Sequence, residues 1–308
     1  MSQIKLWHHF YVFCNVKQLF VFLFLSVLSR AQVLNNSEGQ AFTDKPFFNK
    51  TFIKGNKIKS IDGVFNYKRS GEAMYPTKYH YVYQFDEEGN LIASYETRTD
   101  DGTADTTWNK YEYDDKGRVA IHKRGDTKGL TSIHYFFDEK GRVIKEEFWK
   151  EPIDSLGNPE KQVLQNTETM SYDNYDLQEK KTVYNSYQLP YIHVFSYFNE
   201  DGYLIEKEER LMMTSTVYKY KYAYNEKGLM DSIQVFKKNK EIPAEKWTFH
   251  YDEFGNLLEK NYYKDGEYIT ETEIIYNSKS NLMSAVLIRD VKTSFIMAIR
   301  FQDYQYYD

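Results

Sequence analysis

The sequence of 308 residues has little cysteine, and the position of its one cysteine excludes most thiol chemistry. Cys14 lies before a short apolar run, Leu19 to Leu28, which follows Lys17 and precedes the small residues Ser29 and Ala31. A positive flank, a short apolar run and a small-x-small site are typical of a secretory signal peptide. We therefore expect residues 1–31 to be removed, leaving a mature chain without disulfides, cysteine metal sites or cysteine nucleophiles. No cysteine follows the run directly, so a lipoprotein is not expected.

Long hydrophobic runs and a basic excess are also missing. The run from Leu19 to Leu28 has about half of the roughly 20 residues that a membrane-spanning helix needs, so no transmembrane segment is expected after cleavage. The chain has 40 Lys+Arg against 45 Asp+Glu, a net charge of −5. A nucleic-acid surface needs a strong basic excess, so nucleic-acid partners are not expected.

Proline and glycine are scarce, whereas aromatic residues are abundant. The chain has 6 prolines and 15 glycines but 29 tyrosines and 21 phenylalanines. Such a composition excludes collagen-like and linker-like polymers, and it is too apolar for a disordered protein.

A short unit recurs about every 27 residues. It reads aromatic-x-aromatic, Asp or Asn, two polar residues, Gly, any residue, then two apolar residues. Asp176 and Ser280 stand in the glycine position of two weaker copies. Self-similarity at such a period indicates a repeat architecture. The clear copies lie at 83–92, 111–120, 135–144, 196–205, 222–230 and 249–258, and the weaker ones at 170–178 and 274–283.

The chemistry of this unit is that of a β-hairpin. Aromatic residues alternate before each turn, which is a strand signal. Asp or Asn caps a type I turn with its side chain, and Gly follows where φ is positive. The residues expected to form the turns are Asp86 and Gly89, Asp114 and Gly117, Asp138 and Gly141, Asn199 and Gly202, Asn225 and Gly228, and Asp252 and Gly255.

These hairpins predict an all-β fold. Repeated antiparallel β-hairpins would form a long, coiled or twisted meander sheet with its aromatic face on the inner side, because one layer cannot otherwise bury that face. We expect an extended lead-in at 32–50 and a single β-hairpin repeat domain at 51–308. About eight units would span 79 to 290, and a closing strand would span 295–308.

The repeated Tyr-Asp-x-x-Gly-x-Leu/Val motif resembles the YD-repeat proteins, also called RHS-like repeat proteins. The resemblance covers about residues 79 to 290. It implies a β-rich ribbon that coils into a shell on an exported bacterial protein, and it implies carbohydrate or cell-surface binding. This chain is much shorter than the large members and lacks the boundary motif before a toxin segment, so toxin encapsulation is not expected.

No common catalytic signature is present in the sequence. The histidines outside the leader fall in different repeats, and each Asp-rich turn offers too few oxygens for calcium. We therefore expect no enzyme activity, no metal and no cofactor. Aromatic residues outside the repeat frame are the candidates for stacking on a ligand. These are Trp149, Tyr187, Tyr191, Tyr203, Phe254, Tyr262 and Tyr263.

The leading hypothesis is an exported, non-enzymatic β-repeat scaffold at the cell envelope, in the periplasm, on the cell surface or secreted. Its partner would be a cell-surface glycan or an envelope protein. A carbohydrate-binding module using exposed aromatics is one alternative. A glycan-active enzyme whose carboxylates converge only in the fold is another, and it requires a concave pocket with two carboxylates within roughly 5–10 Å.

Overall fold

A computed structural model describes residues 32–100, 103–126, 129–152, 160–237 and 240–308. The expected signal peptide, residues 1–31, lies outside the described residues. No helix in the described part of the chain is long and apolar enough to cross a membrane. The strands are β1 (Ile58–Lys68), β2 (Tyr75–Phe85), β3 (Leu91–Asp100), β4 (Thr103–Tyr113), β5 (Val119–Asp126), β6 (Gly129–Phe137), β7 (Val143–Pro152), β8 (Val163–Tyr175), β9 (Gln178–Tyr184), β10 (Pro190–Phe198), β11 (Leu204–Leu211), β12 (Thr216–Tyr224), β13 (Met230–Lys237), β14 (Glu245–Tyr251), β15 (Leu257–Lys264), β16 (Glu267–Tyr276), β17 (Met283–Asp290) and β18 (Ile296–Tyr306).

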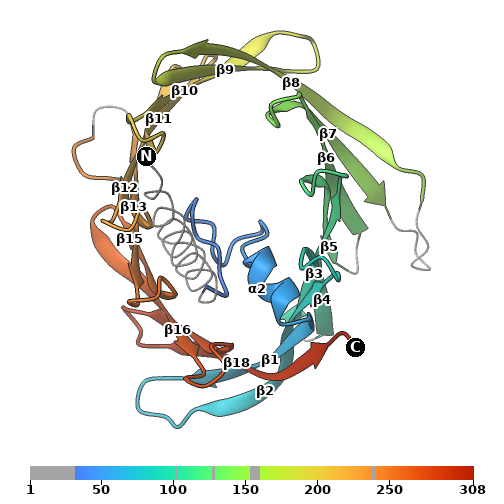
Figure 1. The fold of residues 1–308 in the computed structure, drawn as a ribbon, viewed down its shortest axis with the longest axis vertical. Coiled ribbons are helices and arrows are strands. Elements are labelled where there is room, and N and C mark those ends of the chain that lie inside the picture. The colour runs from blue at the N-terminus through green and yellow to red at the C-terminus, as the bar shows by residue number, and fades with distance from the viewer. Residues whose placement is uncertain (1–31, 101–102, 127–128, 153–159, 238–239) are drawn as a thin grey trace, which may run out of the picture.

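The strands form one closed antiparallel barrel (Figure 1). Each strand pairs with the next along the chain, and β18 returns to pair with β1, with Phe65 opposite Ile299. The predicted all-β antiparallel hairpin meander is confirmed, but an open, coiled or twisted sheet is wrong. The physical reason is the β1–β18 pairing, which satisfies both edge strands of the 18-stranded sheet and leaves no free edge.

The Asp-x-x-Gly turns lie together at one end of the barrel, which we call the repeat-turn rim. At Gly89, φ is +82°, its backbone N–H donates to the carbonyl of Asp86, and the Asp86 side chain accepts from the N–H of Asn90. A side chain at Gly89 would also collide with the carbonyl of Lys50. The connections β1–β2, β3–β4 and so on lie at the opposite end, which we call the loop rim.

The two weaker copies differ in detail from the expected unit. β8 continues through Asp173, which pairs with Lys180, and the chain turns at 176–177 without a register shift. In the other copy the left-handed residue is Asn281, with φ +56°, one position after Ser280.

Residues 32–56, which we call the plug, fold inside the barrel (Figure 1). They include the whole segment, residues 32–50, that the sequence predicts as an extended lead-in. The plug contains a β-bridge between Leu34 and Phe48 and the short helix α2 (Lys50–Gly55). α2 begins at Asn49, whose side chain accepts from two backbone N–H groups of the first turn. The buried apolar residues of the plug are Val33, Leu34, Ala41, Phe47, Phe48, Phe52 and Ile53.

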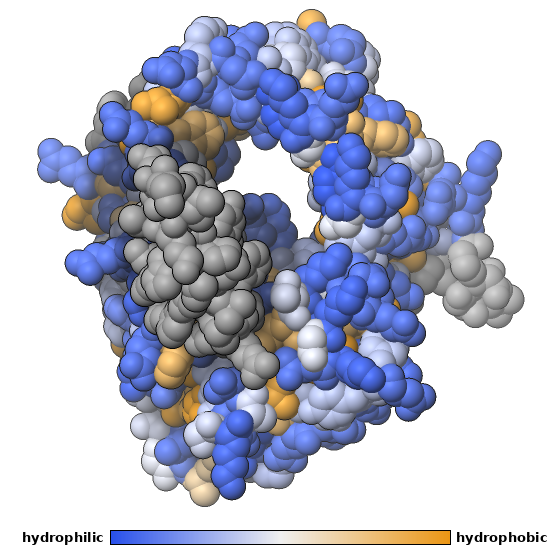
Figure 2. Space-filling view, in the orientation of Figure 1, coloured by the Kyte–Doolittle hydropathy of each residue, from blue (hydrophilic) through white to orange (hydrophobic). Residues whose placement is uncertain are grey.

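The plug divides the barrel into two halves. The filled half comprises β1–β5 and β13–β18, and all fully buried strand residues of the core cluster come from these strands. The open half comprises β6–β12, whose inner side chains are mostly half-buried. Figure 2 shows an opening through the molecule beside the filled region. The aromatic face of the hairpins is the inner face, because Tyr83 and Phe85 pack on Phe48 of the plug. The hydroxyl of Tyr111 likewise donates to the carbonyl of Asp44 in the plug.

Candidate ligand-binding lumen

Where the residue before a repeat turn is tyrosine, its hydroxyl has a structural role. The hydroxyl of Tyr276 donates to the carbonyl of Leu257 at 2.9 Å, which ties one hairpin to the one before it. This contact recurs around the wall, and burial is the first cause of the raised pKa of these tyrosines. Most of the tyrosine repeat therefore holds the barrel together. The other pairs are Tyr113 with Leu91, Tyr172 with Val143, Tyr224 with Leu204, Tyr251 with Met230 and Tyr304 with Met283.

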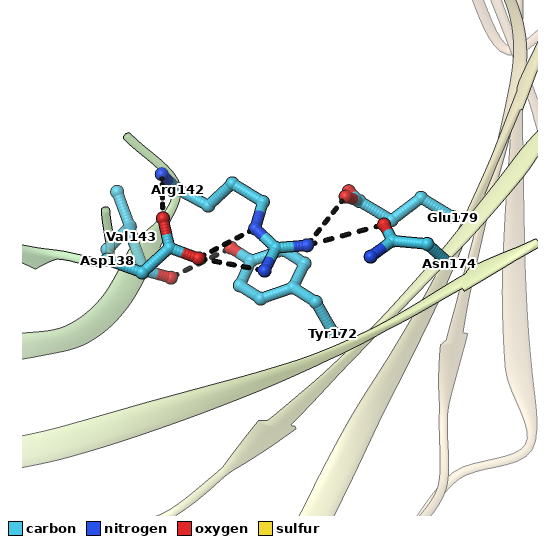
Figure 3. Close-up of polar contacts among 6 residues, drawn as sticks. All are labelled: Asp138, Arg142, Val143, Tyr172, Asn174 and Glu179. Carbon is cyan, nitrogen blue, oxygen red and sulfur yellow. Dashed lines mark hydrogen bonds and ion pairs between the residues drawn. The ribbon is translucent and has the colours of Figure 1, made fainter. Parts of the chain in front are cut away.

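Arginine reinforces this contact where it follows the turn glycine (Figure 3). The backbone N–H and Nε of Arg142 donate to the Asp138 carboxylate at 2.9 and 2.8 Å, and the guanidinium lies 4.3 Å from the ring centre of Tyr172. Hydrogen bonds from Arg142 lower the pKa of Asp138. Arg142 also reaches Asn174 and Glu179. All these groups satisfy one another, so this cluster is structural.

The inner wall of the open half carries paired carboxylates. Glu146 on β7 lies opposite Glu168 on β8, on the inner face that also bears Tyr172. Burial and then the charge of Glu168 raise the pKa of Glu146, while Lys181 and the plug residue Lys45 oppose that shift. Tyr191 is hydrogen-bonded to Glu168, and burial followed by that bond raises the pKa of its hydroxyl.

A second polar cluster lies further around the same half. Lys207 Nζ is 2.8 Å from Glu209 and 4.0 Å from the ring centre of Tyr220. The Tyr220 hydroxyl donates to Glu209 at 3.0 Å. Burial and then the charge of Glu209 raise the pKa of Tyr220. An aromatic ring, a carboxylate and an ammonium group thus share one patch of the inner wall.

A cavity of about 410 Å³ joins this patch to the plug. Lys260 lines it and donates to the carbonyl of Ala41 at 2.7 Å, and burial lowers the pKa of its ammonium group to about 8. Pockets that combine aromatic faces with a few polar groups bind small polar ligands. The wall of the cavity includes Tyr218, Tyr220, Tyr222, Glu245, Trp247 and Lys260.

The seven aromatic candidates from the sequence do not form one site. Tyr191 and Tyr262 face inward, and Tyr262 packs on Trp247 with ring centres 5.2 Å apart. Trp149 and Tyr263 lie on the outer wall, where Trp149 donates to Glu147 and Tyr263 stacks on Tyr268. The remaining three, Tyr187, Tyr203 and Phe254, lie in turns.

Sequence reasoning missed the polar residues of the lumen. Glu146, Glu168, Lys207 and Glu209 are not among the candidate ligand-binding residues named from the sequence. The available signal was the even spacing between Glu168 and Tyr172. Residues an even number apart in a strand lie on the same face, so Glu168 lies on the aromatic face with Tyr172. Within the described part of the chain, no three metal-ligating side chains converge.

Comparisons with known proteins identify no family. No protein-family model and no curated protein matches the chain. Among solved structures, a porin-like protein from Bacteroides uniformis is 12% identical, with a TM-score of 0.38, over 80% of this chain and 98% of that chain. A porin-like protein from Bacteroides vulgatus is 10% identical, with a TM-score of 0.31, over 81% and 98%. The LolA superfamily protein NE2245 from Nitrosomonas europaea is 10% identical, with a TM-score of 0.21, over 83% and 91%.

The closed barrel corrects the resemblance to YD-repeat proteins. The hairpins close into an 18-stranded barrel through the β1–β18 pairing, whereas a YD-repeat ribbon would coil. The repeated motif therefore reports a hairpin with its tyrosine contact and not membership of that family.

Proposed function

We propose that this protein is an exported, non-enzymatic binding scaffold of the cell envelope, and that it holds its ligand inside the open half of the barrel. The observation that carries the proposal is the polar and aromatic inner wall of β6–β12, which the plug leaves accessible. In the filled half, by contrast, the plug covers the same face with apolar side chains.

The composition of this wall favours a carbohydrate ligand. Sugar rings present apolar faces that stack on aromatic rings and hydroxyls that bind carboxylates and ammonium groups. Tyr220, Glu209 and Lys207 supply these three kinds of group within one patch. The cavity of about 410 Å³ beside them falls within the range of small-molecule sites. The proposed surface is thus the lumen, and scattered exposed aromatics have no part in it.

The outer wall favours an aqueous compartment. It carries ion pairs such as Lys123 with Glu112 at 3.0 Å and Lys219 with Glu206 at 2.7 Å. A sheet that faces lipid instead carries a band of apolar side chains on its outer surface. The periplasm, the cell surface and the extracellular medium all meet this requirement.

The test is a binding assay with bacterial envelope glycans on an array. We expect the protein to bind a subset of glycans and Tyr220→Ala to lose that binding. Tyr263→Ala is the matched control, because it removes a stacked tyrosine from the outer wall of a neighbouring hairpin. Failure of the unmodified protein to bind any glycan, or equal loss in both variants, would contradict the proposal.

A glycan-active enzyme is the second candidate, and the pairing of Glu146 with Glu168 favours it. Directly opposed residues bring two carboxyl groups within the separation that retaining glycosidases use, roughly 5 Å. The raised pKa of Glu146 suits a general acid. Release of reducing sugar from envelope glycans, lost in both Glu146→Gln and Glu168→Gln, would establish this candidate. Glycan binding without any release of reducing sugar would reject the enzyme and favour the binding scaffold.

A further inference from the structure

Exposed apolar side chains gather on one section of the loop rim. Large apolar residues are exposed at the start of β8 and in the described residues of the next three connections, β9–β10, β11–β12 and β13–β14. Met213 is 89% exposed and Tyr187 is 82% exposed. The full set, which we call the apolar rim, is Val163, Leu164, Tyr187, Leu189, Met212, Met213 and Ile242.

The rest of the loop rim is different. The β1–β2 connection presents Arg69, Ser70, Gly71 and Glu72, all exposed, and the β15–β16 connection is a two-residue turn of Asp265 and Gly266. Among the described loop-rim residues, exposed large apolar side chains are therefore concentrated from β7 to β14, whereas the β1–β2 connection adds one, Tyr75, which is 42% exposed. Exposed patches of this kind mark interaction surfaces.

Lysines lie beside the apolar rim. A pocket of about 430 Å³ on the outer wall next to Ile242 is lined by Lys221, Lys237 and Lys240, together with Lys219 and the acids Glu208 and Glu241. Within the described residues, Lys221, Lys237 and Lys240 have no ion pair, whereas Glu208 is paired with Arg210. This section is basic although the whole chain has a net charge of −5.

We propose that the apolar rim docks on the surface of an anionic lipid bilayer. Met213, Tyr187 and Ile242 would insert among the headgroups, and the lysines beside them would contact lipid phosphates. Apolar side chains combined with lysines bind membranes through buried apolar area and attraction to anionic lipids. A second copy of the chain is the poorer occupant, because a symmetric contact would bring the same lysines face to face.

Docking in this way orients the barrel. The apolar rim lies along the wall of the open half on the loop rim, so the lumen would open toward the membrane. The repeat-turn rim would face away from it. The inference does not depend on what the lumen binds, so its failure and the failure of the proposed function are separate results.

Vesicle flotation tests the inference with the mature chain. We expect the protein to float with vesicles of phosphatidylcholine and phosphatidylglycerol in equal parts and to stay behind with phosphatidylcholine alone. The double variant Tyr187→Asp with Met213→Asp should lose at least about tenfold in bound fraction, because two apolar contacts become anionic. Lys237→Glu with Lys240→Glu should lose binding to the anionic vesicles as well.

Phe254→Asp is the matched control. Phe254 is 65% exposed but lies on the repeat-turn rim, so this variant should float like the unmodified protein. The altered side chains are exposed, and near-ultraviolet circular dichroism checks that each variant is folded. The inference is overturned if the unmodified protein floats with neither vesicle, if Phe254→Asp loses binding equally, or if the rim variant loses only a dimer seen by size-exclusion chromatography.

Discussion

The two halves of the barrel use one hairpin for two purposes. In the filled half, Phe85 is 1% exposed and packs on Phe48 of the plug with ring centres 4.9 Å apart. In the open half, Phe198 holds the same place in its hairpin, yet it is only half-buried. The repeat therefore specifies the wall, and the plug decides which part of the inner face becomes core.

The wall itself is built alike in both halves. Tyr276 in the filled half and Tyr172 in the open half both donate to the first residue of the preceding return strand. The hydrogen bonds of a closed ring do not require a filled centre. A barrel whose plug fills only one half can therefore stay closed around an open lumen in the other half.

The largest predicted difference concerns the two phenylalanines. Phe85→Ala should lower the free energy of unfolding by about 3–5 kcal/mol, because it leaves a cavity against the plug. Phe198→Ala should cost less than about 2 kcal/mol, because its half-buried ring has fewer contacts to lose. Urea denaturation followed by tyrosine and tryptophan fluorescence measures both. Equal losses would remove the distinction between the halves.

The next effect concerns the tyrosine contact. Tyr276→Phe should lower the free energy of unfolding by about 1–3 kcal/mol, because the carbonyl of Leu257 loses its partner in a buried setting. Tyr172→Phe should cost less, because water in the open lumen can replace the lost hydroxyl. The same denaturation assay decides, and a larger loss at Tyr172 would count against an accessible lumen.

A smaller effect is the pH dependence that Lys260 confers on the filled half. Its pKa is lowered to about 8 by burial, so above that pH the folded state releases a proton that the unfolded state keeps. Stability should therefore rise by about 1 kcal/mol from pH 8 to about pH 9. The gain is lost again as pH falls through 8. Lys260→Met should flatten this part of the stability profile. An unchanged slope in that variant would mean that another group causes the pH dependence.

The smallest effect lies in the open half, at Glu146. Its pKa is raised by burial and by Glu168, so its contribution to stability is present at low pH and is lost as pH rises through the folded-state pKa. Glu146→Gln should therefore slightly raise the melting temperature at neutral pH. Glu147→Gln on the outer wall is the control and should not raise it, because it removes the ion pair of Glu147 with Lys145.

The strands and turns were readable from the sequence because they are local. Alternating aromatics and the Asp86 to Gly89 spacing specify a strand and its turn within ten residues. Closure was not readable, because β1 and β18 lie outside the repeats and pair across more than 200 residues.

The lumen was hidden for a related reason. Residues 32–49 have no periodicity, so nothing in them indicates burial, although Phe47 and Phe48 enter the core. Alternation shows which face a side chain takes but not what covers that face. Glu146 and Glu168 could be assigned to a face, whereas their pairing depends on a register that only the folded sheet supplies.

Hydrogen exchange followed by mass spectrometry on residues 32–308 tests the division into two halves most directly. Exchange of backbone amides reports local opening, which is rarest where buried contacts are densest. The account predicts that peptides from β1, β2 and β15–β18 exchange far more slowly than peptides from β7–β11. Equal protection around the ring, or slower exchange in β7–β11, would contradict it.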